Sequence, residues 1–152
     1  MDKDLIFMKR AFEQALLGFD KEEIPVGAVV VYKNEIIAEA HNESIQKTDP
    51  TSHAEIEAIR KAAIKIGNYR LTGATMYVTL EPCLMCCGAL IHARFNKVIF
   101  STLDKKSGAV VSNGSLLEAK FINHQVKFEQ GLLQEESSEL LKKFFKDKRS
   151  KD

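Results

Sequence analysis

The feature that most constrains the fold is an alternation of strand and helix patterns in the middle of the chain. Residues 75–80 are predicted to form a strand, residues 83–93 a helix, and residues 97–101 a second strand. An alternation of this kind implies parallel strands joined by a right-handed crossover. The sequence therefore predicts an α/β fold.

The N-terminal part predicts a helix followed by a hairpin. Apolar residues recur at three- and four-residue spacing from Leu5 to Phe19, which is typical of a helix with one buried face. Two β-prone runs, residues 26–32 and 35–41, are separated by only two residues, so they should pair antiparallel. A second helix is expected over residues 52–66.

The rest of the chain completes a mixed sheet. Residues 103–123 lack clean periodicity and are expected to form a loop with room for a short helix. Residues 126–129 are expected to add a fifth strand, and residues 133–145 define a closing helix with a lysine-rich end. The prediction is a single domain over residues 1–152, with a five-stranded mixed sheet flanked by helices.

Composition and charge narrow the setting and the partners. The formal net charge of the 152 residues is +1, so any nucleic-acid partner must be held by a local patch. The three cysteines, Cys83, Cys86 and Cys87, lie too close together to cross-link distant segments, which indicates a reduced intracellular setting. The N-terminus resembles neither a signal peptide nor a membrane span, so we expect a cytoplasmic protein.

Two short motifs, His53-x-Glu55 and Pro82-Cys83-x-x-Cys86, carry the chemistry. Cys83 and Cys86 are three residues apart, so in the first turn of a helix their sulfurs can bind one metal ion. A helix N-terminus also favours the thiolates that zinc requires. His53 offers a third ligand from another helix start. One nitrogen and two sulfurs leave the fourth tetrahedral position for water, as in a catalytic zinc site.

Glu55 has two interpretations. Residues two apart in a regular helix point in nearly opposite directions, so His53 must lie in the opening turn if both residues share a site. Ser52-x-x-Glu55 is also a capping-box pattern, in which Glu55 only satisfies a backbone N–H group. Beside a metal site, the carboxylate can instead take a proton from water, and we predict Glu55 as the catalytic acid and base.

The cysteine pair and the other histidines leave alternatives open. A Cys-x-x-Cys pair can be a redox pair or half of a four-ligand structural zinc site. Cys87 points about 100° away from Cys86 around the helix and is expected to be a small buried residue. His41, His92 or His124 could complete a closed site, although isolated histidines are more often hydrogen-bonding groups.

His53-x-Glu55 together with Pro82-Cys83-x-x-Cys86 is the signature of zinc-dependent nucleobase deaminases. Over nearly its whole length the chain resembles the bacterial tRNA-specific adenosine deaminases. The resembling segments outside the signature are residues 24–29, 41–42, 49–51, 68–71, 77–81, 104–109, 123–124 and 140–145. The resemblance implies a cytidine-deaminase-like three-layer α/β/α fold, one zinc ion per subunit and a homodimer. It also implies deamination of adenosine to inosine at the wobble position of a tRNA anticodon.

The resemblance further implies substrate contacts that spacing does not show. Asn42 and Asn123 match positions that contact the extruded nucleotide. Asp104, Lys106 and Ser107 match a loop that holds the flanking backbone of the tRNA anticodon stem-loop. Without the resemblance, the same residues would be interpreted as a strand end, a turn and an ordinary solvated loop.

Four residues depart from the pattern that the family usually shows. Ser101, Val111 and Ser137 stand where glycine, glycine and cysteine are usual, and Gln125 replaces a common arginine. Ser137 lies in the predicted closing helix and says little about function. Val111 and Gln125 flank the segment expected to face RNA, where they could alter a loop or remove a phosphate contact. They bear on the substrate and not on the chemistry.

Two other functions share parts of this pattern. A deaminase of a free nucleobase or nucleoside, such as guanine, cytosine or cytidine, would close the same metal site around a small molecule. A catalytically silent, zinc-stabilised RNA-binding subunit would have no chemical use for Glu55. Residues 104–109 and the basic C-terminal helix favour the RNA-directed enzyme. The lysines of that helix could hold phosphates, but they also suit a solvated helix end.

Overall fold

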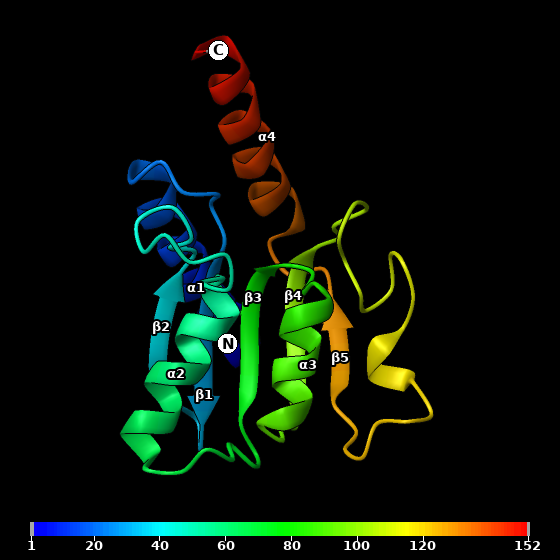
Figure 1. The fold of residues 1–152 in the computed structure, drawn as a ribbon. Coiled ribbons are helices and arrows are strands. Elements are labelled where there is room, and N and C mark those ends of the chain that lie inside the picture. The colour runs from blue at the N-terminus through cyan, green and yellow to red at the C-terminus, as the bar shows by residue number, and fades with distance from the viewer. Residues whose placement is uncertain (1, 152) are drawn as a thin grey trace.

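The computed structural model describes residues 2–151 and contains a five-stranded mixed sheet (Figure 1). The strands are β1 (Gly27–Tyr32), β2 (Glu35–His41), β3 (Thr75–Leu80), β4 (Lys97–Thr102) and β5 (Lys127–Gln130). They lie in the order β2-β1-β3-β4-β5. β1 is antiparallel to β2 and β3, whereas β3, β4 and β5 are parallel, as the alternation of strand and helix predicted.

Helices cover both faces of the sheet and complete the predicted three-layer arrangement (Figure 1). They are α1 (Lys3–Asp20), α2 (Ala54–Ile66), α3 (Leu84–His92) and α4 (Gln134–Lys151). α1 and α4 lie on one face, and α2 and α3 lie on the other. A short 3₁₀-helix, η1 (Leu116–Glu118), lies within the loop expected after β4.

The sheet is buried on both sides because alternate residues of each strand face the two helical layers. In β1, Ala28 and Val30 join the core on the side of α2 and α3, whereas Val29 and Val31 pack with Met8 of α1. β3 and β4 continue the same period of two. Nearly continuous apolar strands of this kind are typical of sheets that carry helices on both faces.

The turn between β1 and β2 has the predicted two-residue length. Lys33 and Asn34 both have positive φ angles, 50° and 64°, as a type I′ turn requires. Because β2 reverses β1 and β1 reverses β3, the strands β2, β3, β4 and β5 all end at the same edge of the sheet. Segments that follow these strands therefore come together there, and α4 extends past this edge (Figure 1).

Element boundaries differ from the prediction mainly at the helix ends. α2 begins at Ala54 and α3 at Leu84, later than expected, because the residues before them stay extended. β5 begins one residue later than expected, at Lys127. α4 continues to Lys151, so the lysine-rich segment is part of the helix. Within residues 2–151, no helix has the length and apolar content needed to cross a membrane.

Gly27, the first residue of β1, marks the closest approach of α1 to the sheet. A Cβ atom there would lie 1.9 Å from the carbonyl oxygen of Ala11 and 2.5 Å from the nitrogen of Ala15. We expect Gly27→Ala to lower the free energy of unfolding by about 3 kcal/mol, because backbone atoms must move apart. Chemical denaturation measures this change. In the control Gly88→Ala, the new Cβ meets nothing within 4 Å, so stability should not fall. Equal stability of Gly27→Ala and the wild type would contradict the predicted clash.

Candidate active site

The three predicted metal ligands converge at the edge where β3 ends. The Nδ1 atom of His53 lies 3.6 Å from the sulfur of Cys83 and 3.6 Å from the sulfur of Cys86. The three ligand atoms all lie within 4.8 Å of one another. Among the described residues, this is the one His, Cys, Asp or Glu cluster with that geometry. The cluster is positioned to hold a single metal ion.

In each motif the first metal ligand lies just before a helix, so its side chain can point toward the site. His53 is the N-cap residue of α2, with φ −69° and ψ 156°, and Cys83 is the N-cap residue of α3, with φ −78° and ψ 178°. Both residues are extended, so their side chains need not follow the helical rotation. Cys86, in the first turn of α3, lies on the same side of the helix as Cys83.

The same geometry argues against the capping interpretation of Glu55. Because His53 lies outside the regular turns of α2, it and Glu55 can face the same site although they are two residues apart. The capping box of Ser52 and Glu55 does not form, since α2 begins later and its N-cap makes no side-chain hydrogen bond. Glu55 is instead buried next to the cysteine and histidine side chains.

Protonation in this cluster reflects close contacts among four titratable groups. The hydrogen bond from Cys86 holds the pKa of Cys83 at about 4, so Cys83 is a thiolate. The same contact raises the pKa of Cys86, and the hydrogen bond to Cys83 raises the pKa of His53. Burial raises the pKa of Glu55 to about 7. A carboxyl group with a pKa near neutrality is suited both to accepting and to donating a proton.

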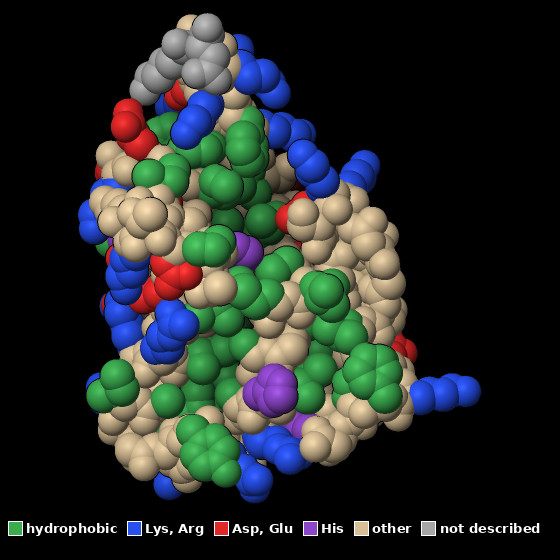
Figure 2. Space-filling view, in the orientation of Figure 1, with side chains coloured by type: hydrophobic (Ala, Val, Ile, Leu, Met, Phe, Trp, Pro, Cys, Tyr) green, Lys and Arg blue, Asp and Glu red, His purple; other side chains and the backbone are tan. Residues whose placement is uncertain are grey.

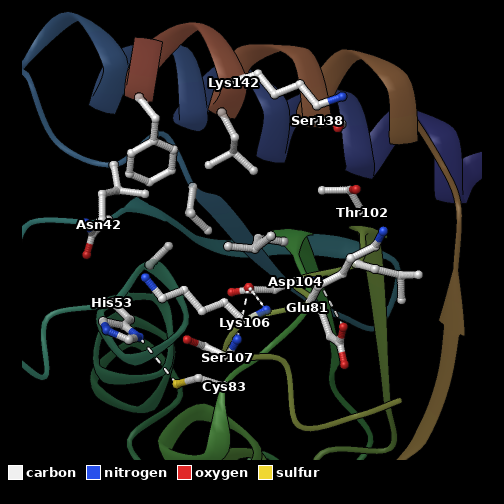
Figure 3. A pocket seen from close by; sticks show the side chains of 18 of the residues that line it. Asn42, His53, Glu81, Cys83, Thr102, Asp104, Lys106, Ser107, Ser138 and Lys142 are labelled. Atoms are coloured by element: carbon white, nitrogen blue, oxygen red, sulfur yellow. Dashed lines mark hydrogen bonds between the residues drawn. The ribbon is translucent and has the colours of Figure 1, made fainter. Parts of the chain in front are cut away.

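His53 and Cys83, two of the three cluster residues, line a cavity of about 810 Å³ together with Glu55 (Figure 3). This volume lies within the range of ordinary small-molecule sites, about 300–1,000 Å³. The two metal-binding motifs, the loop after β4 and one side of α4 surround the cavity. The candidate metal ligands thus lie on one side of the cavity, and the loop after β4 and α4, which come later in the sequence, form its other walls.

Four of the five predicted substrate-binding residues line this cavity. Asn42 follows β2, and Asp104, Lys106 and Ser107 follow β4 (Figure 3). The Asn42 side-chain oxygen accepts a hydrogen bond of 3.0 Å from the Ser44 hydroxyl. The Asp104 carboxylate accepts hydrogen bonds of 3.1 Å from the backbone N–H groups of Lys106 and of Ser107. One Asp104 oxygen therefore shapes the loop on which all three residues lie.

The structure does not bring the fifth residue, Asn123, to this cavity. Its carbonyl oxygen instead accepts a hydrogen bond from Arg94, which follows α3. The reason is topological: β5 is parallel to β4, so the chain must return to the opposite edge of the sheet before β5 begins. Asn123 lies at the end of that return, shortly before β5 begins at Lys127.

One side of α4 forms a wall of the cavity, whereas the sequence predicted only that the lysines of this helix could hold phosphates. Lys142 and Arg149 make this wall basic, and Phe145 adds a half-exposed aromatic ring. Lys and Arg side chains gather around α4 in the space-filling view (Figure 2). The cavity-lining residues of α4 have helical spacing in the sequence, which indicates a common face but not which part of the protein that face contacts. They are Ser138, Leu141, Lys142, Phe145 and Arg149.

Two of the four residues that depart from the usual family pattern, Ser101 and Ser137, are in contact with each other. The buried hydroxyl of Ser101 in β4 hydrogen-bonds with the hydroxyl of Ser137 in α4 at 2.9 Å and with the carbonyl of Leu132 at 2.5 Å. Ser137 therefore has a structural role that its place in the predicted closing helix did not indicate, because it joins α4 to the sheet. Gln125, in contrast, is exposed and does not line the cavity.

Comparison with known proteins agrees with this geometry. Residues 1–149 match the family model of the MafB19-like deaminases. The chain is 49% identical over 144 residues to the tRNA-specific adenosine deaminase of Aquifex aeolicus, with 95% of each chain covered. It is 42% identical over 151 residues to the tRNA-specific adenosine deaminase of Bacillus subtilis, covering 99% of this chain and 94% of that one. The chain belongs to the tRNA-specific adenosine deaminase family.

Solved structures place this deaminase in the expected fold. A structure from biochemical and structural studies of A-to-I editing by tRNA:A34 deaminases matches with a TM-score of 0.87 and 38% identity, covering 89% of this chain and 98% of that one. The guanine deaminase of Nitrosomonas europaea matches with a TM-score of 0.79 and 20% identity, covering 92% and 83% of the two chains. The second likeness shows the fold alone. The predicted cytidine-deaminase-like architecture is confirmed.

Two neighbouring cysteines, Cys86 and Cys87 of α3, allow a direct test of the metal-binding residues. We expect Cys86→Ser to weaken metal binding by more than about 100-fold, because it removes a sulfur ligand. Cys87→Ser is the matched control, since Cys87 is buried, lies outside the cluster, and directs its thiol at the Pro82 carbonyl oxygen, 3.7 Å away. Elemental analysis of the purified proteins measures metal per chain. Equal metal content in the two variants would contradict the assignment of Cys86.

Proposed function

We propose that this deaminase hydrolyses the exocyclic amine of adenosine at the wobble position of a tRNA anticodon and forms inosine. The observation that carries the proposal is a buried Glu55 beside a three-ligand metal cluster, in a cavity with a basic wall. The relatives named for tRNA adenosine deamination support adenosine in tRNA as the substrate.

Zinc is the metal that we propose for the cluster. Two thiolates and one imidazole are ligands that zinc prefers, at roughly 2.3 Å for sulfur and 2.0 Å for nitrogen. Around a tetrahedral ion, those lengths put sulfur and nitrogen about 3.6 Å apart. The two distances from His53 to Cys83 and Cys86 are both 3.6 Å. The donor set and its spacing therefore fit one zinc ion, with one coordination position left for a non-protein ligand.

In the proposed mechanism, Glu55 moves the protons. A bound zinc ion supplies a Lewis acid that makes water acidic enough to react near neutral pH. Glu55 accepts a proton from water as the water adds to C6 of adenine, and it donates this proton to N1. It then accepts the proton of the new C6 hydroxyl and donates it to the departing amine. The C6–O bond forms, the C6–N bond breaks, and ammonia leaves. The pKa of about 7 that burial gives Glu55 supports this double role.

The cavity wall supports a substrate larger than a free base. The amine of adenine is inaccessible when the base is stacked or paired, so the nucleotide must be splayed out of the anticodon loop. Lys106, Lys142 and Arg149 supply cationic groups beside the cavity for the phosphates on either side of that nucleotide. Asn42 offers an amide to the edge of the base, and Asp104 and Ser107 complete the loop that meets the RNA backbone.

A homodimer with one zinc ion per subunit and a cytoplasmic location remain predictions. Large apolar side chains exposed at the surface support self-association, since extensive exposed apolar surface is unusual in a monomer. Hydrophobic side chains are visible among polar ones on the face that carries α2 and α3 (Figure 2). The most exposed apolar side chains in the described chain include Ile64, Tyr69, Leu84 and Phe121.

The role of Glu55 can be tested against a nearby carboxylate. We expect Glu55→Gln to reduce kcat by about 10²–10⁴-fold with zinc still bound, because the amide cannot accept and donate the transferred proton. Glu57→Gln is the matched control: Glu57 is also buried in α2, but it pairs with Lys47 and Arg60. Ammonia release at saturating anticodon stem-loop RNA measures kcat. Full activity of Glu55→Gln would remove this residue from the mechanism.

The substrate is tested by comparing an anticodon stem-loop RNA with free adenine, guanine, cytosine and their nucleosides. We expect deamination of the wobble adenosine at a kcat/KM at least about 100-fold above that of any free base or nucleoside, because small molecules forgo the contacts to flanking phosphates. Inosine in the RNA is detected by sequencing. Turnover of free bases alone would instead support a nucleobase deaminase, and no turnover at all would support a silent RNA-binding subunit.

A further inference from the structure

Glu81, the residue that follows β3, is a buried carboxylate at the base of the loop after β4. It is 2% exposed. Its Oε2 atom accepts hydrogen bonds from the backbone N–H groups of Val110 (3.0 Å), Val111 (2.8 Å) and Ser112 (3.0 Å). Its Oε1 atom accepts hydrogen bonds from the N–H group of Asp104 (3.0 Å) and from the Ser112 hydroxyl. One side chain thus holds both ends of the segment 104–112.

The same loop is attached to the backbone that carries a metal ligand. The N–H group of Ala109 donates a hydrogen bond of 2.9 Å to the Pro82 carbonyl, and Gly108 forms an isolated antiparallel bridge with Cys83. Gly108 also lies against Glu81, because a Cβ atom there would be 2.3 Å from the carboxylate. Glu81 is two residues from Cys83, so covalent geometry links the position of the loop to that of the metal ligand.

The contacts of Glu81 match an ionised carboxylate. An ionised carboxylate only accepts hydrogen bonds, and all of its contacts here come from donors. Hydrogen bonds to a charged group are also stronger than those between neutral groups.

We propose that Glu81 is a positioning residue for the substrate. Its carboxylate holds residues 104–112 in a preformed arrangement, so that Lys106 and Ser107 meet the RNA backbone at a set distance from the metal cluster. The loop needs such a support because Lys105, Lys106 and Ser107 are exposed and add no core packing of their own. A preformed loop avoids the entropic cost of ordering when the substrate binds. This role rests on the function proposed above.

A second buried carboxylate provides a matched control. Glu23, between α1 and β1, is fully buried and accepts hydrogen bonds from the backbone N–H groups of Ile45 (3.1 Å) and Gln46 (2.7 Å). Residues 43–52 do not line the cavity. Glu23 therefore has the same chemistry as Glu81 but holds a loop outside the substrate wall.

The test compares Glu81→Gln with Glu23→Gln. Glutamine keeps the shape of the side chain, but its NH₂ group cannot accept, so at least one backbone donor loses its partner. With anticodon stem-loop RNA, we expect Glu81→Gln to raise KM about tenfold, with kcat within about threefold of the wild type and zinc content unchanged. Glu23→Gln should leave KM unchanged. An unchanged KM in Glu81→Gln, or an equal rise in both variants, would overturn the proposal.

Amide hydrogen exchange gives a readout that does not need activity. Peptides covering residues 104–112 should exchange faster in Glu81→Gln than in the wild type or in Glu23→Gln, and unchanged protection would overturn the proposal. If the wild type fails to deaminate RNA while the exchange result holds, the proposed function fails but the holding of the loop by Glu81 stands.

A milder variant covers the case in which Glu81→Gln does not fold. Ser112→Ala removes only the hydroxyl that donates to Oε1 and leaves the backbone donors in place. We expect it to raise KM about threefold, since one hydrogen bond to the carboxylate is lost. A KM equal to that of the wild type would overturn the proposal.

Discussion

The meeting of two helix N-termini at one edge of the sheet is the constraint on which the rest of the site depends. His53 and Cys83 each stand just before a helix, in extended backbone, and Cys86 follows in the first turn of α3. A crossover from β3 through α3 to β4 returns each strand end to the same edge, so the ligands do not have to cross the core to meet. Glu55 is buried for the same reason, because it lies in the first turn of α2 and α2 packs against the sheet.

The chemical part and the substrate part of the site are supported by different forces. The metal ligands and Glu55 lie on helices that are anchored by a continuous apolar core. The loop after β4 is held by hydrogen bonds to one carboxylate, Glu81, and α4 is joined to β4 through the hydroxyls of Ser101 and Ser137. Polar attachments depend on orientation more than apolar packing does, so they suit walls that must present charged groups in a defined arrangement.

Much of the fold and the reactive centre could be predicted from the sequence because the signals are local. Helical and strand periods gave the order of elements, and the two-residue gap at Lys33 and Asn34 gave the hairpin. Long-range placement could not be read in this way. Asn123 was expected at the substrate, but the parallel pairing of β5 with β4 leaves it beside Arg94. The lysines of α4 were considered as phosphate contacts, but the place of this helix in the cavity wall could not be predicted, because a helical period identifies a face without identifying its neighbour.

By itself, the sequence determined the α/β class, the candidate ligand trio and the acid–base candidate, since the fold class depends on residue periods and the candidates belong to two short motifs. The tertiary structure decided which segments surround the metal cluster. It placed α4 and residues 104–107 around one cavity and excluded Asn123 from it. It also joined Ser101 to Ser137 and gathered five donors around Glu81. Such contacts depend on strand order and direction, which bring residues together independently of their separation along the chain.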